Sequence, residues 1–321
     1  MRPDLRTTLA GIEMASPVIV PSGTFGYGEE FVRFADFDYA HIGAVQLKGT
    51  TLEPRLGNPP PRIAETPAGV LNAIGLQNPG VEAVVTEILP RLAESGVTVP
   101  LIANVAGDTV EEYAEVAGRF SDAANVAAIE VNISCPNVRR GGLAFGADPD
   151  AAAGVVRAVR AATDRPVIAK LTPNTAHLVP VADACVAAGA DALSLINTLV
   201  GMVIDVTSRR PLLGNRTGGL SGPAIRPVAV AKVYEVFEAL GHRVPLVGMG
   251  GIATADDAFE FVLAGASAVG VGTALFSNHR APREIAAGLV QHLESAGFTR
   301  LAGAVGAAHK EVRKQEPDDI P

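Results

Sequence analysis

The sequence predicts a single α/β domain, a (β/α)8 TIM barrel with long loops at the C-terminal face of its strands. Eight short apolar runs recur along the 321 residues, and segments with helical periodicity lie between most of them. Near-continuous apolar runs are typical of parallel strands that are buried on both faces. A composition of 48% hydrophobic and 19% charged residues supports a large core and argues against disorder. We therefore expect one domain over residues 1–321, although length alone favours two.

The eight expected strands are rich in β-branched residues and stop at polar residues or glycine. In chain order they are PVIVPSG (17–23), AVQLKG (44–49), PLIANVAG (100–107), AAIEVNIS (127–134), PVIAKL (166–171), ALSLIN (192–197), PLVGMGG (245–251) and AVGVGT (268–273). A doubly wound open sheet is the alternative. It ranks lower because the count reaches eight and no GxGxxG follows the first run.

Helical segments separate these runs, and several carry recognisable start and stop signals. A proline near the start and a glycine after the end delimit 78–96, and a possible Asp cap with acidic first-turn residues opens 108–120. The remaining expected helices follow the same logic and cover 148–163, 179–189, 223–241 and 254–265.

Three connections are too long for simple turns. They are a proline-rich segment without helical period (53–80), a glycine-rich segment (138–149), and 201–222, in which VIDVTSRRPLL predicts a small hairpin. Connections of this length are usually functional, and all three follow strand carboxyl ends, where barrel enzymes carry their sites. In the second connection the paired glycines at 141 and 142 predict a mobile lid over 138–146.

Composition narrows the function classes. A formal net charge of -8 argues against nucleic acid or an anionic membrane as partner. Cys135 and Cys185 are too few for a disulfide framework or a thiolate metal site, so we expect reduced thiols and no metal. The first residues contain no apolar run long enough for a signal peptide or a membrane helix, which predicts a cytoplasmic protein.

Polar residues stand where the apolar runs stop: Ser22, Lys48, Asn104, Asn132, Cys135, Lys170, Asn197 and Thr198. A single strand-end Asn or Thr is usually turn chemistry, and a single Cys is usually a small buried hydrophobe. Taken together these residues predict a site. Lys48 and Lys170 emerge from apolar strands into a closed barrel mouth, where an unpaired charge is expensive. They need an anionic partner that the apolar runs do not supply.

Glycines at the ends of the last two strands indicate which anion binds. Gly250, Gly251, Gly272 and Thr273 leave backbone N–H groups bare where barrels commonly bind phosphate, and SGP (221–223) precedes another helix start. A phosphorylated cofactor lying across the mouth accounts for glycines on one side and lysines and amides on the other. Flavin mononucleotide (FMN) fits this pattern.

Several long motifs resemble class 1 dihydroorotate dehydrogenases over nearly the whole chain. These are KGTTLEPRLGNPPPRIAETPAGVLNAIGLQNPG (48–80), NISCPN (132–137), INTLVGM (196–202), NRTGGLSGPA (215–224) and GMGGI (248–252). The sequence of the first motif is similar to that of the NAD-linked subclass, 1B. Gly49 departs from the family, in which alanine or serine more often follows the lysine.

The resemblance implies an enzyme that oxidises (S)-dihydroorotate to orotate in pyrimidine (UMP) biosynthesis. Cys135 resembles the base that takes the C5 proton, while FMN takes the hydride from C6. Cys185 lies within an alanine-rich helical segment and is expected to be a buried, inert thiol. The substrate-binding positions that it implies are Lys48, Asn72, Ala73, Ile74, Gly75, Leu76, Asn132, Asn197 and Thr198. The implied cofactor-binding positions are Ser22, Lys48, Gly49, Asn104, Asn132, Lys170, Ile196, Gly222, Gly250, Gly251, Gly272 and Thr273.

The same resemblance implies a partner. The chain has no Rossmann fingerprint and too few cysteines for a [2Fe–2S] cluster, so FAD, the cluster and the NAD+ site are expected on an iron–sulfur subunit docked to a homodimer of this chain. The alternatives are a fumarate-linked dihydroorotate dehydrogenase, a dihydropyrimidine or tRNA dihydrouridine oxidoreductase, and a non-catalytic assembly subunit. The acidic charge disfavours an RNA substrate, and the joint presence of lysines, amides and thiol disfavours a non-catalytic role.

Overall fold

The eight expected strands form a closed parallel barrel in a computed structural model that describes residues 2–33, 37–134 and 143–309. Around the barrel each strand pairs with the next one in chain order, and the last pairs with the first, with Val269 opposite Val18. The barrel strands are β3 (Val18–Val20), β4 (Ala44–Gln46), β7 (Leu101–Val105), β8 (Val126–Asn132), β9 (Val167–Lys170), β10 (Ala192–Leu195), β15 (Leu246–Met249) and β16 (Ala266–Gly270). The predicted (β/α)8 barrel is therefore confirmed.

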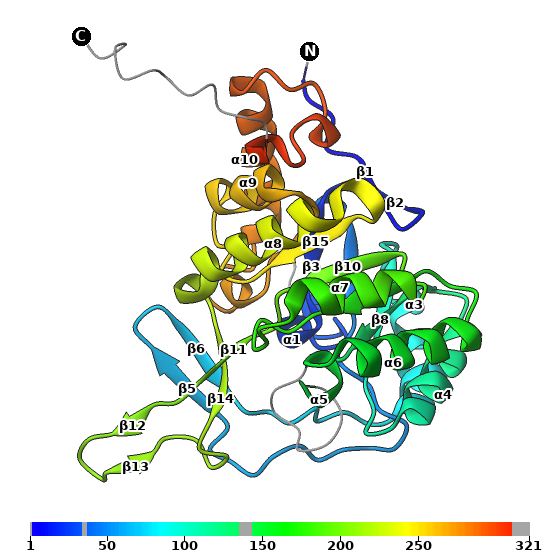
Figure 1. Ribbon diagram of the computed structural model, residues 1–321, viewed down its shortest axis with the longest axis vertical. Helices are drawn as coiled ribbons and strands as arrows, with labels where there is room; N and C mark the ends of the chain where they lie inside the picture. The colour runs from blue at the N-terminus through cyan, green and yellow to red at the C-terminus, as the bar shows by residue number, and fades with distance from the viewer. Residues whose placement is uncertain (1, 34–36, 135–142, 310–321) are drawn as a thin grey trace.

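Helices cover the outside of the barrel, and all six expected segments are helical (Figure 1). The major helices are α4 (Val110–Ser121), α6 (Pro149–Ala162), α7 (Leu178–Ala187), α8 (Arg226–Leu240), α9 (Ala255–Ala264) and α10 (Ala281–Ser295). The expected helix at 78–96 is built from α2 (Val81–Ala83), a π-helical turn (Val84–Ile88) and α3 (Leu89–Glu94). Two further short helices are α1 (Ser22–Phe25) and α5 (Leu143–Gly146).

Capping side chains fix where these helices begin. Thr109 accepts a hydrogen bond from the Glu112 N–H at the start of α4, and Asp148 accepts one from the Ala151 N–H at the start of α6. Thr254 forms a capping box at the start of α9. Each cap satisfies an N–H group that has no partner within the helix.

A helix after the last barrel strand and a hairpin before the first were not predicted from the sequence. Helix α10 lies beyond the last strand, and β1 (Thr7–Leu9) and β2 (Ile12–Met14) form a hairpin that precedes the first barrel strand. The hairpin packs Leu9, Ile12 and Met14 against the apolar residues inside the barrel. The hairpin therefore belongs to the core of the domain.

A second sheet rises from the two longest connections and extends away from the barrel, at the lower left of Figure 1. Its four strands are β11 (Leu199–Gly201), β14 (Gly218–Ser221), β6 (Gly69–Asn72) and β5 (Ile63–Thr66), in that spatial order. The predicted hairpin is present as β12 (Ile204–Asp205) and β13 (Arg210–Pro211), whereas the β5–β6 hairpin was missed. Because Asn72 pairs with Gly219, the sheet brings the first and third long connections together beside the barrel mouth.

Within the described ranges, no helix combines the length and the apolar character needed to cross a bilayer. Residues 138–142 of the expected lid (138–146) lie outside the described residues.

Candidate active site

Two adjoining cavities open where the barrel strands end. The larger has a volume of about 270 Å³ and lies against β15, β16 and the start of α8, while the smaller, of about 130 Å³, lies against β4 and the 74–76 segment. Gly23, Lys170, Asn197 and Thr198 line both. A ligand in one cavity would therefore touch a ligand in the other.

Glycine shapes the larger cavity. Gly222, Gly250 and Gly251 have φ angles of 99°, 123° and 82°, a region that favours glycine. A Cβ atom on Gly251 would come within 2.8 Å of the backbone N of Arg226 and of the Gly222 carbonyl. Only bare backbone fits against the start of α8, where N–H groups without helical partners favour an anion.

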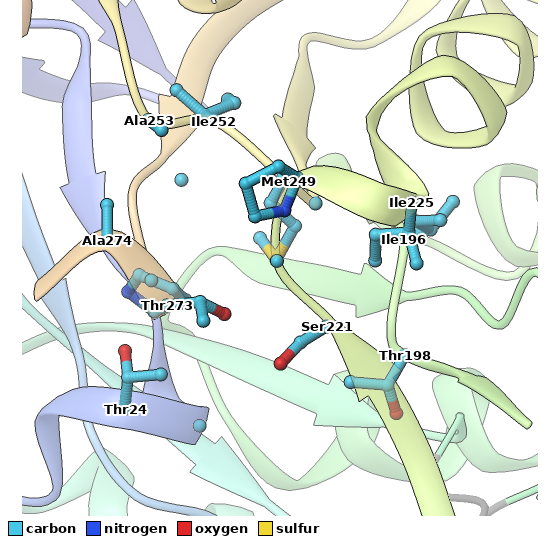
Figure 2. A pocket seen from close by; sticks show the side chains of 18 of the residues that line it. Thr24, Ile196, Thr198, Ser221, Ile225, Met249, Ile252, Ala253, Thr273 and Ala274 are labelled. Atoms are coloured by element: carbon cyan, nitrogen blue, oxygen red, sulfur yellow. The ribbon is translucent and has the colours of Figure 1, made fainter. Parts of the chain in front are cut away.

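The cavity has a polar and an apolar wall (Figure 2). In that view Thr24, Thr273, Ser221 and Thr198 lie in the lower half, and Ile252, Met249, Ile196 and Ile225 lie in the upper half. The Thr24 hydroxyl oxygen is buried and has no hydrogen-bond partner among the described residues. An unsatisfied buried hydroxyl beside bare N–H groups fits a phosphate ester, and the apolar wall fits a planar ring system. The residues present therefore fit FMN.

The smaller cavity contains a lysine without a counter-ion. Lys48 is largely buried and forms no ion pair with any described residue. Burial lowers the pKa of Lys48 below the usual lysine value, the positive charge of Arg62 lowers it further, and Glu30 opposes the shift. A negatively charged ligand group would supply the missing partner.

Lys170 differs from Lys48, because its partner is supplied by the barrel itself. Its Nζ lies 3.6 Å from Glu130 Oε2, and both side chains are almost completely buried. Lys170 also donates to the Ser22 hydroxyl at 3.4 Å. The expectation that the strands supply no anion is thus wrong for Lys170, because Glu130 of β8 points into the barrel and balances its charge.

A series of hydrogen bonds links the amides around the smaller cavity. Asn104 donates to Glu130, Asn132 Nδ2 donates to Asn104 Oδ1 at 3.1 Å, and the Ser134 hydroxyl donates to Asn132 Oδ1 at 3.1 Å. Asn197 Nδ2 in turn donates to Ser134 Oγ at 2.8 Å. The carboxyl ends of three strands, β7, β8 and β10, are connected in this way.

The structure brings most of the sequence-predicted site together. The smaller cavity is lined by Ser22, Lys48, Gly49, Asn72, Ile74, Gly75, Leu76, Asn132, Lys170, Asn197 and Thr198, and the larger one by Ile196, Gly222, Gly250, Gly251, Gly272 and Thr273 as well as the shared residues.

Two of the predicted residues that the structure describes line neither cavity. Asn104 is fully buried behind Asn132, and Ala73 is buried with its N–H donating to the Arg62 carbonyl and its carbonyl accepting from Asn58. Cys135 lies outside the described residues, so its role stays a prediction.

Sequence reasoning missed Glu130 and Thr24. Glu130 is a single carboxylate within the apolar run AAIEVNIS, and a charge at a position where both faces of the strand are buried was a signal of a buried ion pair. Thr24 follows the Ser22 strand end within a short helix, and nothing in the sequence distinguishes it from turn chemistry.

Known proteins match the chain over nearly its whole length. A family model described as dihydroorotate dehydrogenase covers residues 4–293. The dihydroorotate dehydrogenase B (NAD(+)) catalytic subunit of Desulforudis audaxviator is 56% identical over 310 residues, covering 97% of this chain and 99% of that protein. The subunit of the same name from Pelobacter propionicus is 56% identical over 307 residues, covering 96% of this chain and 99% of that protein.

The fold has a solved counterpart. A crystal structure of DHODH in complex with ferulenol from Eimeria tenella superposes with a TM-score of 0.81 at 23% identity, covering 96% of this chain and 89% of that chain. The barrel, its two adjoining cavities and the full-length match lead to one conclusion: the chain belongs to the dihydroorotate dehydrogenase family.

Proposed function

We propose that this protein oxidises (S)-dihydroorotate to orotate in pyrimidine biosynthesis, with NAD+ as the final electron acceptor. The observation that carries the proposal is the pair of adjoining cavities, one fitted to a flavin phosphate and the other holding an unpaired lysine. The relatives that are more than half identical over nearly the full length carry the name of the NAD+-linked catalytic subunit, which supports the same reaction.

FMN would lie in the larger cavity. Gly222, Gly250, Gly251, Gly272 and Thr273 would hold its phosphate and ribityl chain. When bound, FMN supplies the acceptor for the hydride that leaves C6 of the substrate. Lys170 would stabilise negative charge that develops at the flavin edge, since it lines both cavities and is held in place by Glu130 and Ser22.

The substrate would lie in the smaller cavity. Lys48 would bind the substrate carboxylate, because it is a buried cation without a partner among the described residues. Asn72, Asn132 and Asn197 would hydrogen-bond the polar edges of the ring, since their side-chain amides line this cavity and can donate to carbonyl oxygens.

The C5 proton would pass to Cys135. The described chain reaches Ser134, which is fully buried and hydrogen-bonded on both sides, by Asn132 and Asn197. Ser134 is therefore held by Asn132 and Asn197, which both line the smaller cavity. A thiol has a pKa near 8.5, and amide donors and lysines nearby would bring it closer to the working pH.

Anaerobic stopped-flow spectroscopy tests the proposal. Dihydroorotate is expected to bleach the flavin of the purified chain, and Cys135→Ala is expected to bind FMN and orotate yet bleach orders of magnitude more slowly. Cys185→Ala is the matched control, because burial in α7 raises the pKa of that thiol to about 12 and keeps it inert. Near-normal bleaching of Cys135→Ala at pH 7 would contradict the role of Cys135, and no bleaching of the wild type would contradict the reaction.

The electrons would leave through a second subunit. We propose a homodimer of this chain that docks an iron–sulfur flavoprotein carrying FAD and a [2Fe–2S] cluster, giving a heterotetramer. The name "catalytic subunit" of the relatives supports a partner, and two cysteines cannot ligate such a cluster. The isolated chain is expected to reduce dyes or oxygen but not NAD+. Robust NADH formation by the chain alone would contradict the partner, and fast turnover with fumarate would move the enzyme to the fumarate-linked subclass.

The projecting sheet offers the surface for a second copy of this chain. Large apolar side chains are exposed at Ile63 of this sheet, at Ile204 and Val206 of the β12–β13 hairpin and at Leu56 before β5, with Val206 87% exposed. A two-stranded hairpin such as β12–β13 is marginal in water unless it is covered. Val206→Asp is expected to shift the protein from dimer to monomer in size-exclusion chromatography with light scattering. A monomeric wild type, or an unchanged dimer in the variant, would contradict this surface.

A further inference from the structure

Glu130 lies at the buried end of a directional series of hydrogen bonds. Its Oε1 accepts from Gln46 Nε2 at 2.6 Å and from the Ser194 hydroxyl at 2.7 Å, while its Oε2 accepts from Asn104 Nδ2 and faces Lys170. Three of these neighbours donate hydrogen bonds, and the fourth, Lys170, is a cation. Because a carboxylate only accepts, Asn104 has to turn its nitrogen toward Glu130 and its oxygen toward the cavity side.

That orientation is passed on from one residue to the next. With its oxygen outward, Asn104 accepts from Asn132 Nδ2, so Asn132 turns its own oxygen toward Ser134. The Ser134 hydroxyl donates to Asn132 and is left to accept from Asn197 Nδ2, and Asn197 Oδ1 accepts from the Thr198 N–H at 2.8 Å. We call Asn104, Asn132, Ser134 and Asn197 the amide chain.

The amide chain decides what the smaller cavity presents to a ligand. Asn132 and Asn197 line the cavity, and each donates one side-chain N–H within the amide chain. The oxygen of Asn132 accepts from Ser134, and that of Asn197 accepts from the Thr198 N–H. What each has left for a ligand is its second N–H. Together with the ammonium of Lys48, these groups make this part of the cavity a set of donors.

We propose that Glu130 is a positioning residue for substrate selection: through the amide chain it fixes Asn132 and Asn197 as donors, so that the cavity selects ligands that present carbonyl and carboxylate oxygens. The inference rests on the proposed function for the identity of the ligand, orotate. Glu130 lines neither cavity, so it acts only through its neighbours.

Two ligands and four variants test this role. The ligands are orotate and the analogue in which an amino group replaces the C4 carbonyl, which reverses donor and acceptor at one ring edge. Their dissociation constants are read from the change in the flavin spectrum at equilibrium, so proton transfer does not enter. The wild type is expected to prefer orotate at least tenfold.

Two variants of Glu130 distinguish the effect of its hydrogen-bond acceptor from the effect of its negative charge. Glu130→Leu removes the acceptor and is expected to lower the preference at least tenfold. Glu130→Gln keeps an acceptor for Asn104, and Gln46, whose buried Oε1 has no partner among the described residues, can turn its amide to accept from the new NH2 group. Its preference is therefore expected to stay within about threefold of wild type.

Ser134→Ala cuts the amide chain without disturbing the ion pair, and it is expected to lower the preference at least threefold. Ser194→Ala, the matched control, removes a hydroxyl that touches only the other oxygen of Glu130, and it is expected to leave the preference unchanged. If Glu130→Leu does not fold, Ser134→Ala decides the outcome.

Two results would overturn the role of Glu130. One is an equal loss of affinity for both ligands in Glu130→Leu and Ser134→Ala, which would mark a structural effect alone. The other is a loss of preference in Glu130→Gln as large as in Glu130→Leu, which would assign the effect to charge. Bleaching of the wild-type flavin by dihydroorotate is measured first, so a failure of the proposed reaction is recognised separately.

Discussion

The two lysines at the barrel mouth have the same chemistry and opposite surroundings. Lys170 is 5% exposed and faces a buried carboxylate at 3.6 Å, whereas Lys48 faces no carboxylate within ion-pair distance among the described residues and has a lowered pKa. The first charge is neutralised by the fold, and the second is left for a ligand.

This difference indicates separate roles for the two lysines, one beside the cofactor and one in binding the substrate. A cation balanced by the protein keeps its place whether or not the site is filled, so Lys170 suits a permanent neighbour such as a cofactor. A cation held without a partner gains most when an anion arrives, so Lys48 suits a substrate that enters and leaves. The predictions below test that division, from the largest expected effect to the smallest.

Lys170→Met is expected to lower the free energy of unfolding by about 3 kcal/mol, because it leaves Glu130 as a buried anion without its cation. Urea titration followed by circular dichroism measures the loss. Adding Glu130→Gln to the same chain is expected to recover much of it, and a double-mutant cycle gives the coupling. An unchanged free energy of unfolding in Lys170→Met would show that Glu130 does not need the charge of Lys170 in the folded protein.

Lys48→Met is expected to weaken orotate binding about 10- to 100-fold, the worth of a hydrogen bond to a charged group of about 1.5–3 kcal/mol. Stability is expected to hold or rise, since no described carboxylate is left behind. Lys232→Met, in an exposed pair with Glu235 on α8, is the matched control and is expected to bind orotate normally. An equal loss of stability in the Lys48 and Lys170 variants would contradict the view that only Lys170 is paired within the protein.

Orotate affinity is expected to fall as pH rises through the lowered pKa of Lys48, by at most tenfold per pH unit for one required proton. Titrating Lys48→Met over the same range isolates the part that belongs to ligand and flavin. The sign for stability is opposite. Between the folded and unfolded pKa values the unfolded chain binds more protons, so the free energy of unfolding rises with pH there. A pH-independent difference between wild type and variant would contradict both statements.

Gly49→Ala is expected to have the smallest effect, a change in orotate affinity of less than about threefold. The new Cβ would meet Asn104 Oδ1 at 2.9 Å and Leu76 Cδ2 at 3.1 Å, so both side-chain ends must give by a few tenths of an ångström. Isothermal titration of orotate measures the change. A loss of orotate affinity as large as that of Lys48→Met would contradict this prediction. It would mean that Asn104 cannot shift to make room for the new methyl group.

The barrel was predictable because its signal is local. Each parallel strand is buried on both faces, so it appears in the sequence as a nearly continuous run of apolar residues, such as PVIAKL and ALSLIN. The N-terminal hairpin was missed because Thr7–Leu9 and Ile12–Met14 are three residues each and bury alternate side chains, which is too short a pattern to identify. Strand Ile63–Thr66 was missed because it has only four residues, follows a run of prolines and buries only Ala64.

The same reason explains which residues of the site could be predicted from the sequence. Residues at strand ends were predicted because the carboxyl ends of all barrel strands meet at one face, which makes their proximity a consequence of the fold. Glu130 and Asn104 required knowledge of which side chains point inward at the same level of four different strands. That depends on the stagger of the closed sheet, which no single segment of sequence contains.

Closure of the barrel also orders its folding. Because Val269 pairs with Val18 and the Leu301 N–H donates to the Asp4 carbonyl, the first strand stays an open edge until the last has been synthesised. Contacts so distant in sequence make folding slow and leave one edge of β3 exposed on the ribosome, where unpaired edges aggregate. A donor–acceptor fluorophore pair on β3 and β16 would therefore report the final step of folding, and chaperone dependence would be greatest just before it.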